Sequence, residues 1–320
     1  MNKIGAAARE SFRESVRIYW TLARISLPLL AAIRFLDEHF NIVAHAGTLL
    51  SPLMSWADLP GAAGIVWATA IFLQLYAAML VLASLWTQLD LTAAQATTLA
   101  AMILTAHALP VELRIVQKAG VRMRAMLLMR LVGALGIGAL LAAIYKTGGW
   151  LQTPATLHFA PPPQIPGWGA WAAAQAKNWI LIYAVILVLV IFIRVLKATH
   201  AERFLIALLA PALRRMGIGA RATTTTLIGM TLGLSYGGAL LIDESRRGDV
   251  NRRDMLCALT LLCLCHSIIE DTLAMLLVGA HISGVLFGRI IFAFAVMFVF
   301  AKIVNRMSDS ALSRWLLIAR

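Results

Sequence analysis

Residues 179–193 read WILIYAVILVLVIFI, a run that is apolar on every face of a helix and carries no charged side chain. A helix on the surface of a soluble protein keeps one polar face, and this run has none. The strict alternation of polar and apolar residues that marks a strand of an outer-membrane barrel is also absent. The run therefore predicts an α-helix that is surrounded by lipid.

The remainder of the chain has the same character. Apolar residues make up 61% of its 320 positions and charged residues 13%, whereas soluble domains have about 45–50% and about 25%. Further apolar stretches occupy residues 61–87, 93–111, 122–146, 222–242 and 284–304. Each is long enough, as a helix, to cross a hydrocarbon layer of about 30 Å. The fold class expected is all-α, a polytopic helical membrane protein.

The net charge of +13 comes from short basic clusters beside the apolar stretches, not from one patch. Such clusters fit membrane topology better than nucleic-acid binding, so no nucleic-acid partner is expected. The three cysteines lie in one apolar segment and offer no disulfide framework. Residues 1–17 are basic and precede no small-residue cleavage site, so the first helix is expected to remain in the mature protein.

The sequence matches itself at an offset of 159 positions. The coinciding pairs are Leu49 and Leu208, Pro52 and Pro211, Asp90 and Asp249, His107 and His266, Gly120 and Gly279, Arg130 and Arg289, and the acids Glu112 and Asp271. Repetition at one ungapped offset indicates a duplication. We predict two copies of one unit, residues 18–146 and 177–305, joined by an extracytoplasmic linker rich in Pro and Trp at residues 147–176.

Each copy has five segments, of which the second, 40–56 or 202–215, is short and contains a proline. If all ten segments cross, almost every basic cluster falls on the cytoplasmic side, and Arg214, Arg215 and Arg221 are the main exceptions. An odd number of crossings per copy inverts the second copy, as in many secondary transporters. We predict about ten crossings in a bacterial inner membrane, with residues 1–17 and 306–320 cytoplasmic. Whether the short segments span fully stays open.

The third helix of the second copy reads GMTLGLSYGGALLIDE from Gly229 to Glu244. Glycine every fourth position allows close helix packing, and this packing is one reading of the pattern. The other reading is that the helix unwinds near Ser235, Tyr236 and Gly237 to expose a binding site. Gln74 is the polar residue of the matching helix in the first copy. The packing reading predicts that Gly233→Leu is harmful and Gly233→Ala milder.

The strongest constellation is Cys263-x-Cys265-His266-Ser267-x-x-Glu270-Asp271. In a continuous helix His266 and Glu270 share a face and could transfer protons. Ionisable groups at membrane depth are functional candidates, although a salt bridge that only joins helices is an alternative. We expect Arg289 to contact Asp271. Metal binding by Cys263, Cys265 and His266 is a weaker alternative, and no metal site is otherwise expected.

The first copy carries His107, Glu112 and Arg130 at the matching positions, and Glu112 is the expected partner of Arg130. Pro110 predicts a break or kink there, because proline removes a backbone donor inside a helix. The second copy has no proline at this place and is expected to continue as one helix. The two halves are thus predicted to share architecture and to differ in chemistry.

Residues 234–254 (LSYGGALLIDESRRGDVNRRD) and 264–276 (LCHSIIEDTLAML) resemble the nucleoside-recognition, or Gate-domain, family of bacterial membrane proteins. The resemblance is strongest over about 225–290 and, through the duplication, weaker over 65–131. That family includes spore-maturation proteins, the membrane part of ferrous-iron transporters and parts of concentrative nucleoside carriers. The resemblance implies a role in membrane transport more than it implies a particular substrate.

We expect a transporter that carries a small solute through a site between two inverted repeats, with protons as candidate coupling ions. An ion or metal permease is one alternative, and a non-transporting scaffold or lipid-binding protein is another. The residues expected to bind solute or to couple are Ser235, Tyr236, Gly237, His266, Glu270, Asp271 and Arg289, with Gln74, His107, Glu112 and Arg130.

The expected partners are membrane lipids and a small solute or ion, and association into a homo-oligomer is left open. No cofactor is expected. The chain lacks the glycine-rich phosphate loop, the HExxH zinc-protease motif and the GxSxG nucleophile motif. These absences favour a protein that is not an enzyme.

Overall fold

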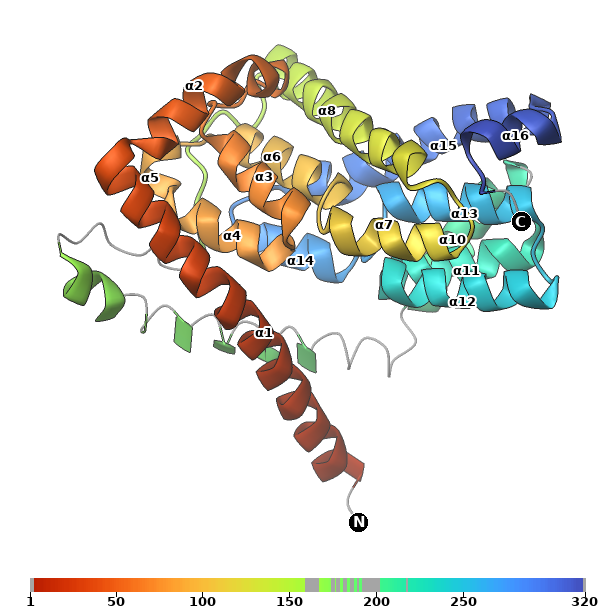
Figure 1. The fold of residues 1–320 in the computed structure, drawn as a ribbon, viewed down its shortest axis with the longest axis horizontal. Coiled ribbons are helices and arrows are strands. Elements are labelled where there is room, and N and C mark those ends of the chain that lie inside the picture. Colours follow the sequence, from red (N-terminus) through yellow and green to blue (C-terminus); the bar gives the residue numbers. More distant parts are fainter. Residues whose placement is uncertain are drawn as a thin grey trace.

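A computed structural model describes residues 3–158, 167–173, 202–216 and 218–318, and single positions between 176 and 191. The first helix expected in the second copy, residues 177–197 with the run 179–193 inside it, lies largely outside the described residues. The described helices are α1 (Lys3–Phe40), α2 (Ile42–Met54), η1 (Ser55–Ala57), α3 (Ala63–Phe72), α4 (Leu75–Ser84), α5 (Trp86–Leu89), α6 (Ala93–Thr105), α7 (Leu109–Lys118), α8 (Met123–Gly148), α10 (Glu202–Arg215), α11 (Ala220–Leu232), α12 (Leu234–Arg247), α13 (Arg252–Leu264), α14 (Glu270–Leu277), η2 (Ser283–Gly288), α15 (Arg289–Arg306) and α16 (Asp309–Trp315). Figure 1 shows α1 beside an elongated body that is formed by the other helices.

At one end of the body, residues from several helices lie near the start of the 147–176 linker. We call this end the linker end. Lys146 Nζ lies 2.9 Å from Asp58 Oδ1, and Gln95 Nε2 donates to the Asp58 carbonyl at 2.8 Å. The backbone N–H of Ala155 donates to Leu91 O at 2.9 Å. The end of α2–η1 and the starts of α3 and α6 therefore lie at one end, beside the C-terminus of α8.

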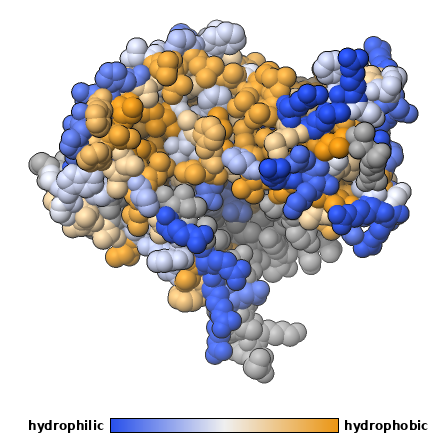
Figure 2. Space-filling view, in the orientation of Figure 1, coloured by the Kyte–Doolittle hydropathy of each residue, from blue (hydrophilic) through white to orange (hydrophobic). Residues whose placement is uncertain are grey.

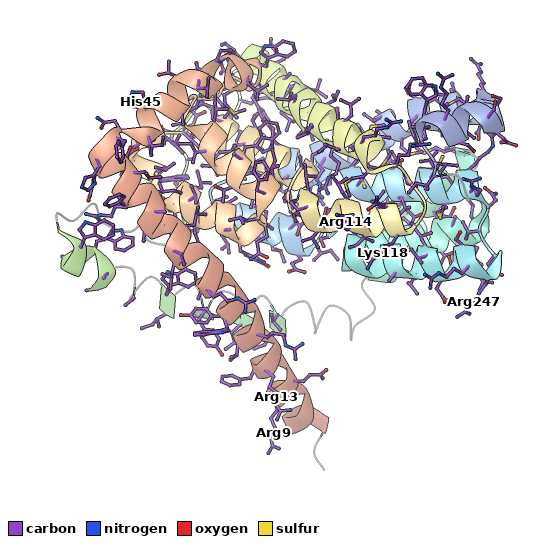
Figure 3. The ribbon with its side chains drawn as sticks, viewed as in Figure 1. Arg9, Arg13, His45, Arg114, Lys118 and Arg247 are labelled. Carbon is purple, nitrogen blue, oxygen red and sulfur yellow. The ribbon has the colours of Figure 1, made fainter. Side chains whose placement is uncertain are left out.

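The opposite, C-terminal end is held by a second set of contacts. The N–H of Arg122 donates to Leu316 O at 2.8 Å, and Arg252 Nη2 donates to Ile318 O at 2.9 Å. Gly219 N–H donates to Asp254 Oδ2 at 3.1 Å. Figure 3 shows Arg247 at this end and His45 at the other. The start of α11, the end of α12, the α7–α8 turn and the C-terminus therefore lie together.

The long helices expected at 61–87 and 222–242 are each replaced by two shorter helices that fold back as a hairpin (Figure 1). A Cβ added to Gly237 would lie 2.4 Å from Gly229 Cα, which requires α11 and α12 to lie side by side. The turn falls at Gly233, whose φ of 98° suits glycine. The α3–α4 hairpin starts and ends at the linker end, and the α11–α12 hairpin at the C-terminal end.

Two other helices are interrupted without folding back. The α6–α7 pair changes direction at Ala108 and the α13–α14 pair at Ser267, and both residues have a φ of 48°. The break near Pro110 was expected, but the continuous helix expected in the second copy is wrong. The backbone at Ser267 ends it without a proline. The side chains of Thr92 and Asn251 cap the N-termini of the two pairs.

Three described segments are long and apolar enough to span a membrane, namely Ala93–Lys118, Met123–Gly148 and Ser283–Arg306. Large apolar side chains on their outer faces remain exposed, among them Val132 on α8 and Ile291 on α15. Figure 2 shows apolar residues over the middle of the body and hydrophilic residues gathered toward the C-terminal end. A lipid-facing belt explains this exposure, because a soluble monomer rarely leaves so much apolar surface in water.

The two ends of the chain are helical where the structure describes them. Helix α1 already begins at Lys3, so the basic residues before position 18, including Arg9 and Arg13 in Figure 3, continue the first helix. The C-terminal segment forms α16 and returns through an isolated bridge between Leu317 and Val121. Both ends of the chain are therefore part of the helical architecture as far as the structure describes them.

Candidate functional site

The interrupted helices meet the hairpin turns in the centre of the molecule. The N–H of Ala108, in the α6–α7 break, donates to Ala70 O near the end of α3 at 2.8 Å. The N–H of Ile268, in the α13–α14 break, donates to Met230 O near the end of α11 at 2.9 Å. Backbone groups freed by the breaks are thus paired across helices, as membrane burial demands.

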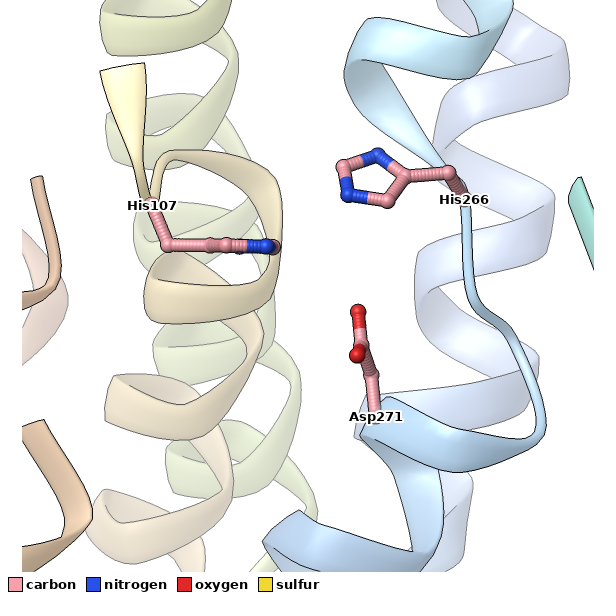
Figure 4. Close-up of side chains that lie close together, drawn as sticks. All are labelled: His107, His266 and Asp271. Atoms are coloured by element: carbon pink, nitrogen blue, oxygen red, sulfur yellow. The ribbon is translucent and has the colours of Figure 1, made fainter. Parts of the chain in front are cut away.

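Two histidines face each other at these breaks (Figure 4). The ring centroids of His107 and His266 are 5.1 Å apart, and both residues are buried. Each Nδ1 lies within hydrogen-bonding distance of the carbonyl four residues earlier, Ile103 O at 3.1 Å and Leu262 O at 2.7 Å. Since a carbonyl only accepts, Nδ1 donates in both rings, and each Nε2 is left for a partner inside the cluster.

Glu112, also buried, lies between the two imidazoles. Its Oε1 is 3.2 Å from His266 Nε2 and 3.5 Å from His107 Nε2. Its other oxygen forms the expected ion pair with Arg130. A carboxylate of the first half therefore contacts a histidine from each half.

Arg130 and Arg289 are fully buried. Arg130 Nε donates to Thr105 O at 2.9 Å, and Arg289 Nη2 donates to Leu104 O at 3.1 Å and to His266 O at 2.8 Å. These carbonyls belong to the ends of interrupted helices, where no intrahelical donor follows. The two guanidinium groups therefore cap the broken helices as well as approaching the acids.

Asp271 is the expected partner of Arg289, and the structure places Arg289 Nη2 3.8 Å from Asp271 Oδ2. This oxygen is buried and has no hydrogen-bond donor. Figure 4 shows the carboxylate directed toward the space between the histidines. Asp271 thus places in the cluster a carboxylate oxygen that can still accept a hydrogen bond or bind a cation.

Glu270 does not pair with His266, contrary to the expectation of a shared helix face. The break at 265–269 removes the helical spacing on which that expectation rested, and His266 turns to Glu112 instead. Glu270 accepts a hydrogen bond from Tyr76 Oη at 2.9 Å. Tyr76 was missed from the sequence, although it lies 159 positions before Ser235, a candidate of the second copy.

The other sequence candidates have separate places. Gln74 is the residue before α4, at the turn of the first hairpin, and Gly237 lies in the α11–α12 contact. Ser235 and Tyr236 belong to the first turn of α12, and their side chains lie outside the described part of the structure. Cys263 and Cys265 are buried in an apolar cluster.

Among the described side chains, His107, His266 and Asp271 bring ligand atoms within 4.8 Å of one another, close enough to surround a metal ion. No cysteine belongs to this group. The weaker alternative from the sequence, Cys263 and Cys265 with His266, shares only His266 with this group.

The chain is similar to the uncharacterized membrane protein YvoD of Bacillus subtilis (strain 168), at 27% identity over 301 residues that cover 92% of this chain and 94% of that protein. No family model matches the chain, and no solved structure does. The similarity and the apolar helices of the described residues together identify a helical membrane protein.

Proposed function

We propose that the protein is a membrane transporter built from two copies of one unit, 18–146 and 177–305, in opposite orientations. The observation that carries this proposal is the composition of the central cluster. Each half contributes one histidine, one acid and one arginine, at positions 159 residues apart in the sequence. Ionisable groups at membrane depth are costly and mark solute or ion pathways.

The paired breaks support the duplication. Ala108 and Ser267 share a φ of 48°, and Gly120 and Gly279, with φ of 88° and 78°, follow at the same offset. The α6–α7 pair runs from the linker end to the C-terminal end, and the α13–α14 pair runs the other way (Figure 1). Matching units that run in opposite directions are the plan of many secondary transporters.

The arrangement favours six crossings and two re-entrant hairpins over ten crossings. Each unit then has three crossings, in the first α1, α6–α7 and α8, and in the second 177–197, α13–α14 and η2–α15. Its second helix, α2 or α10, stays at one surface. Arg214, Arg215 and Arg221, the exceptions in the ten-crossing scheme, then join the other basic clusters on the cytoplasmic side, which satisfies the positive-inside rule.

Hairpins that enter from opposite ends and meet at a polar cluster suit alternating access. A solute at the centre can be reached from either side if each hairpin covers one route. The resemblance to the Gate-domain family points to the same class of function. A scaffold or lipid-binding protein is the rival proposal, in which the same ion pairs only join helices.

Water access to the first hairpin turn separates the two proposals. In a variant whose native cysteines are replaced by alanine, Gln74→Cys should react with a small water-soluble thiol reagent, because a transport pathway reaches the turn. Leu82→Cys, on the same hairpin but 2% exposed, should remain unreacted. Protection of Gln74→Cys from reagent on both sides of the membrane would favour the scaffold.

A further inference from the structure

We propose that His107, His266 and Asp271 form a binding site for one divalent transition-metal ion such as Zn²⁺. This inference rests on the proposed function in one respect, because it names a metal cation as the class of solute. The three residues come from α6–α7 and α13–α14, so the site exists only where the two halves meet.

The two imidazoles direct their Nε2 atoms into the cluster, because both Nδ1 atoms are engaged by backbone carbonyls. Glu112 Oε1 lies 3.5 Å from the Nε2 of His107 and 3.2 Å from the Nε2 of His266. Three groups that can each give a lone pair thus converge in a dry interior, where a bound cation stabilises them. A metal-bound histidine commonly donates its other N–H to a carbonyl in this way.

Asp271 Oδ2 is a buried carboxylate oxygen without a hydrogen-bond donor, and a metal ion would satisfy it. Zinc ligands lie about 2.0–2.2 Å from the ion, so tetrahedral ligands are about 3.5 Å apart. The observed ligand atoms of the three residues lie within 4.8 Å of one another. Small inward rotations of the side chains bring them to bonding distance, and Glu112 is placed to become a fourth ligand.

Charged groups surround the proposed ligands. Arg130 pairs with Glu112, and Arg289 approaches Asp271 at 3.8 Å. The arginines also hold the carboxylates and the broken helix ends in place, a positioning role one contact away from the ion.

The donor set selects the class of ion. Imidazole with carboxylate suits Zn²⁺, Fe²⁺ or Ni²⁺, whereas Mg²⁺ and Ca²⁺ prefer oxygen ligands alone. Thiolate ligands would favour softer ions, and Cys263 and Cys265 stay in the apolar cluster. We therefore expect binding of Zn²⁺ and Co²⁺ and no competition from Mg²⁺.

The test is metal binding by the purified full-length protein in detergent. Wild type should bind one Co²⁺ per chain, with the absorption of a four-coordinate ion, and Zn²⁺ should displace it. His107→Gln, His266→Gln and Asp271→Asn should each raise the Kd at least tenfold. The matched control is His45→Gln, because exposed His45 makes the same Nδ1 contact to the carbonyl four residues earlier.

Absence of stoichiometric binding by wild type overturns the inference, and so does binding that the three variants retain. If the histidine variants fail to fold, two other measurements test the site: Co²⁺ binding by Asp271→Asn, and the ligand signature in the Co²⁺ spectrum of wild type. A wild-type spectrum without nitrogen ligands would contradict the site. Labelling of Gln74→Cys needs no metal. Failure of metal binding therefore leaves the transport proposal standing, and failure of the Gln74→Cys labelling leaves the metal-binding result standing.

Discussion

Arg289→Met should lower the free energy of unfolding by about 3–5 kcal/mol, the cost of removing one partner from a buried ionic network. Arg289 is fully buried and donates to Leu104 O and His266 O, so its loss leaves carbonyls of two interrupted helices without a donor. It also leaves Asp271 as a buried charge without its cation. Thermal unfolding of the protein in detergent measures the effect.

Arg306→Met is the matched control, because Arg306 is exposed at the end of the same helix, α15. It should change stability by less than about 0.5 kcal/mol. Combining Arg289→Met with Asp271→Asn should recover part of the loss. Recovery stays incomplete because the carbonyls still lack a donor. Equal stability of Arg289→Met and Arg306→Met would show that Arg289 is not part of a buried network.

Gly233→Ala and Gly237→Ala should each prevent normal folding of the α11–α12 hairpin. Gly233 has a φ of 98°, where a side chain is strained, and a Cβ there would lie 3.0 Å from Ser267 Oγ. A Cβ on Gly237 would lie 2.4 Å from the Gly229 backbone, which cannot move aside as a side chain can. The milder effect expected for Gly233→Ala from packing alone is therefore revised.

Gly169→Ala provides the comparison, because a Cβ at Gly169 has no neighbour within 4 Å. Yield and monodispersity in detergent should be near normal for Gly169→Ala and strongly reduced for the two hairpin variants. Normal behaviour of Gly237→Ala would mean that α11 and α12 do not pack in this manner.

Part of this architecture could be predicted because it depends on local signals. Hydropathy identifies the helices, and the 159-residue offset relates His107 to His266 and Arg130 to Arg289. The ion pairs of Arg130 with Glu112 and of Arg289 with Asp271 follow from the cost of burying a charge alone. These pairs lie within one copy, where sequence spacing still constrains distance.

The hairpins and the contacts between halves could not be predicted in this way. An apolar run has the same hydropathy pattern whether it forms one helix or two. No proline marks the turn at Gln74 or the break at Ser267. His266 and Glu112 are 154 positions apart in the sequence, and their contact depends on the breaks in α6–α7 and α13–α14. Helical periodicity relates side chains within one element only.

In the proposed topology, two oppositely oriented units bring hairpins in from opposite sides of the membrane. Asp58 and Arg215, both exposed, precede the two hairpins and distinguish the topologies. The ten-crossing scheme places Asp58 in the cytoplasm and Arg215 outside, and the hairpin scheme places them the other way round. Lys146→Cys and Lys118→Cys serve as references for the outer and cytoplasmic sides under both schemes.

The decisive measurement is labelling of single cysteines in intact cells with a membrane-impermeant thiol reagent. We predict that Asp58→Cys reacts as readily as Lys146→Cys, and that Arg215→Cys, like Lys118→Cys, reacts only after the cells are opened. Labelling of Arg215→Cys in intact cells together with protection of Asp58→Cys would contradict the hairpin topology and with it the proposed arrangement of the transporter.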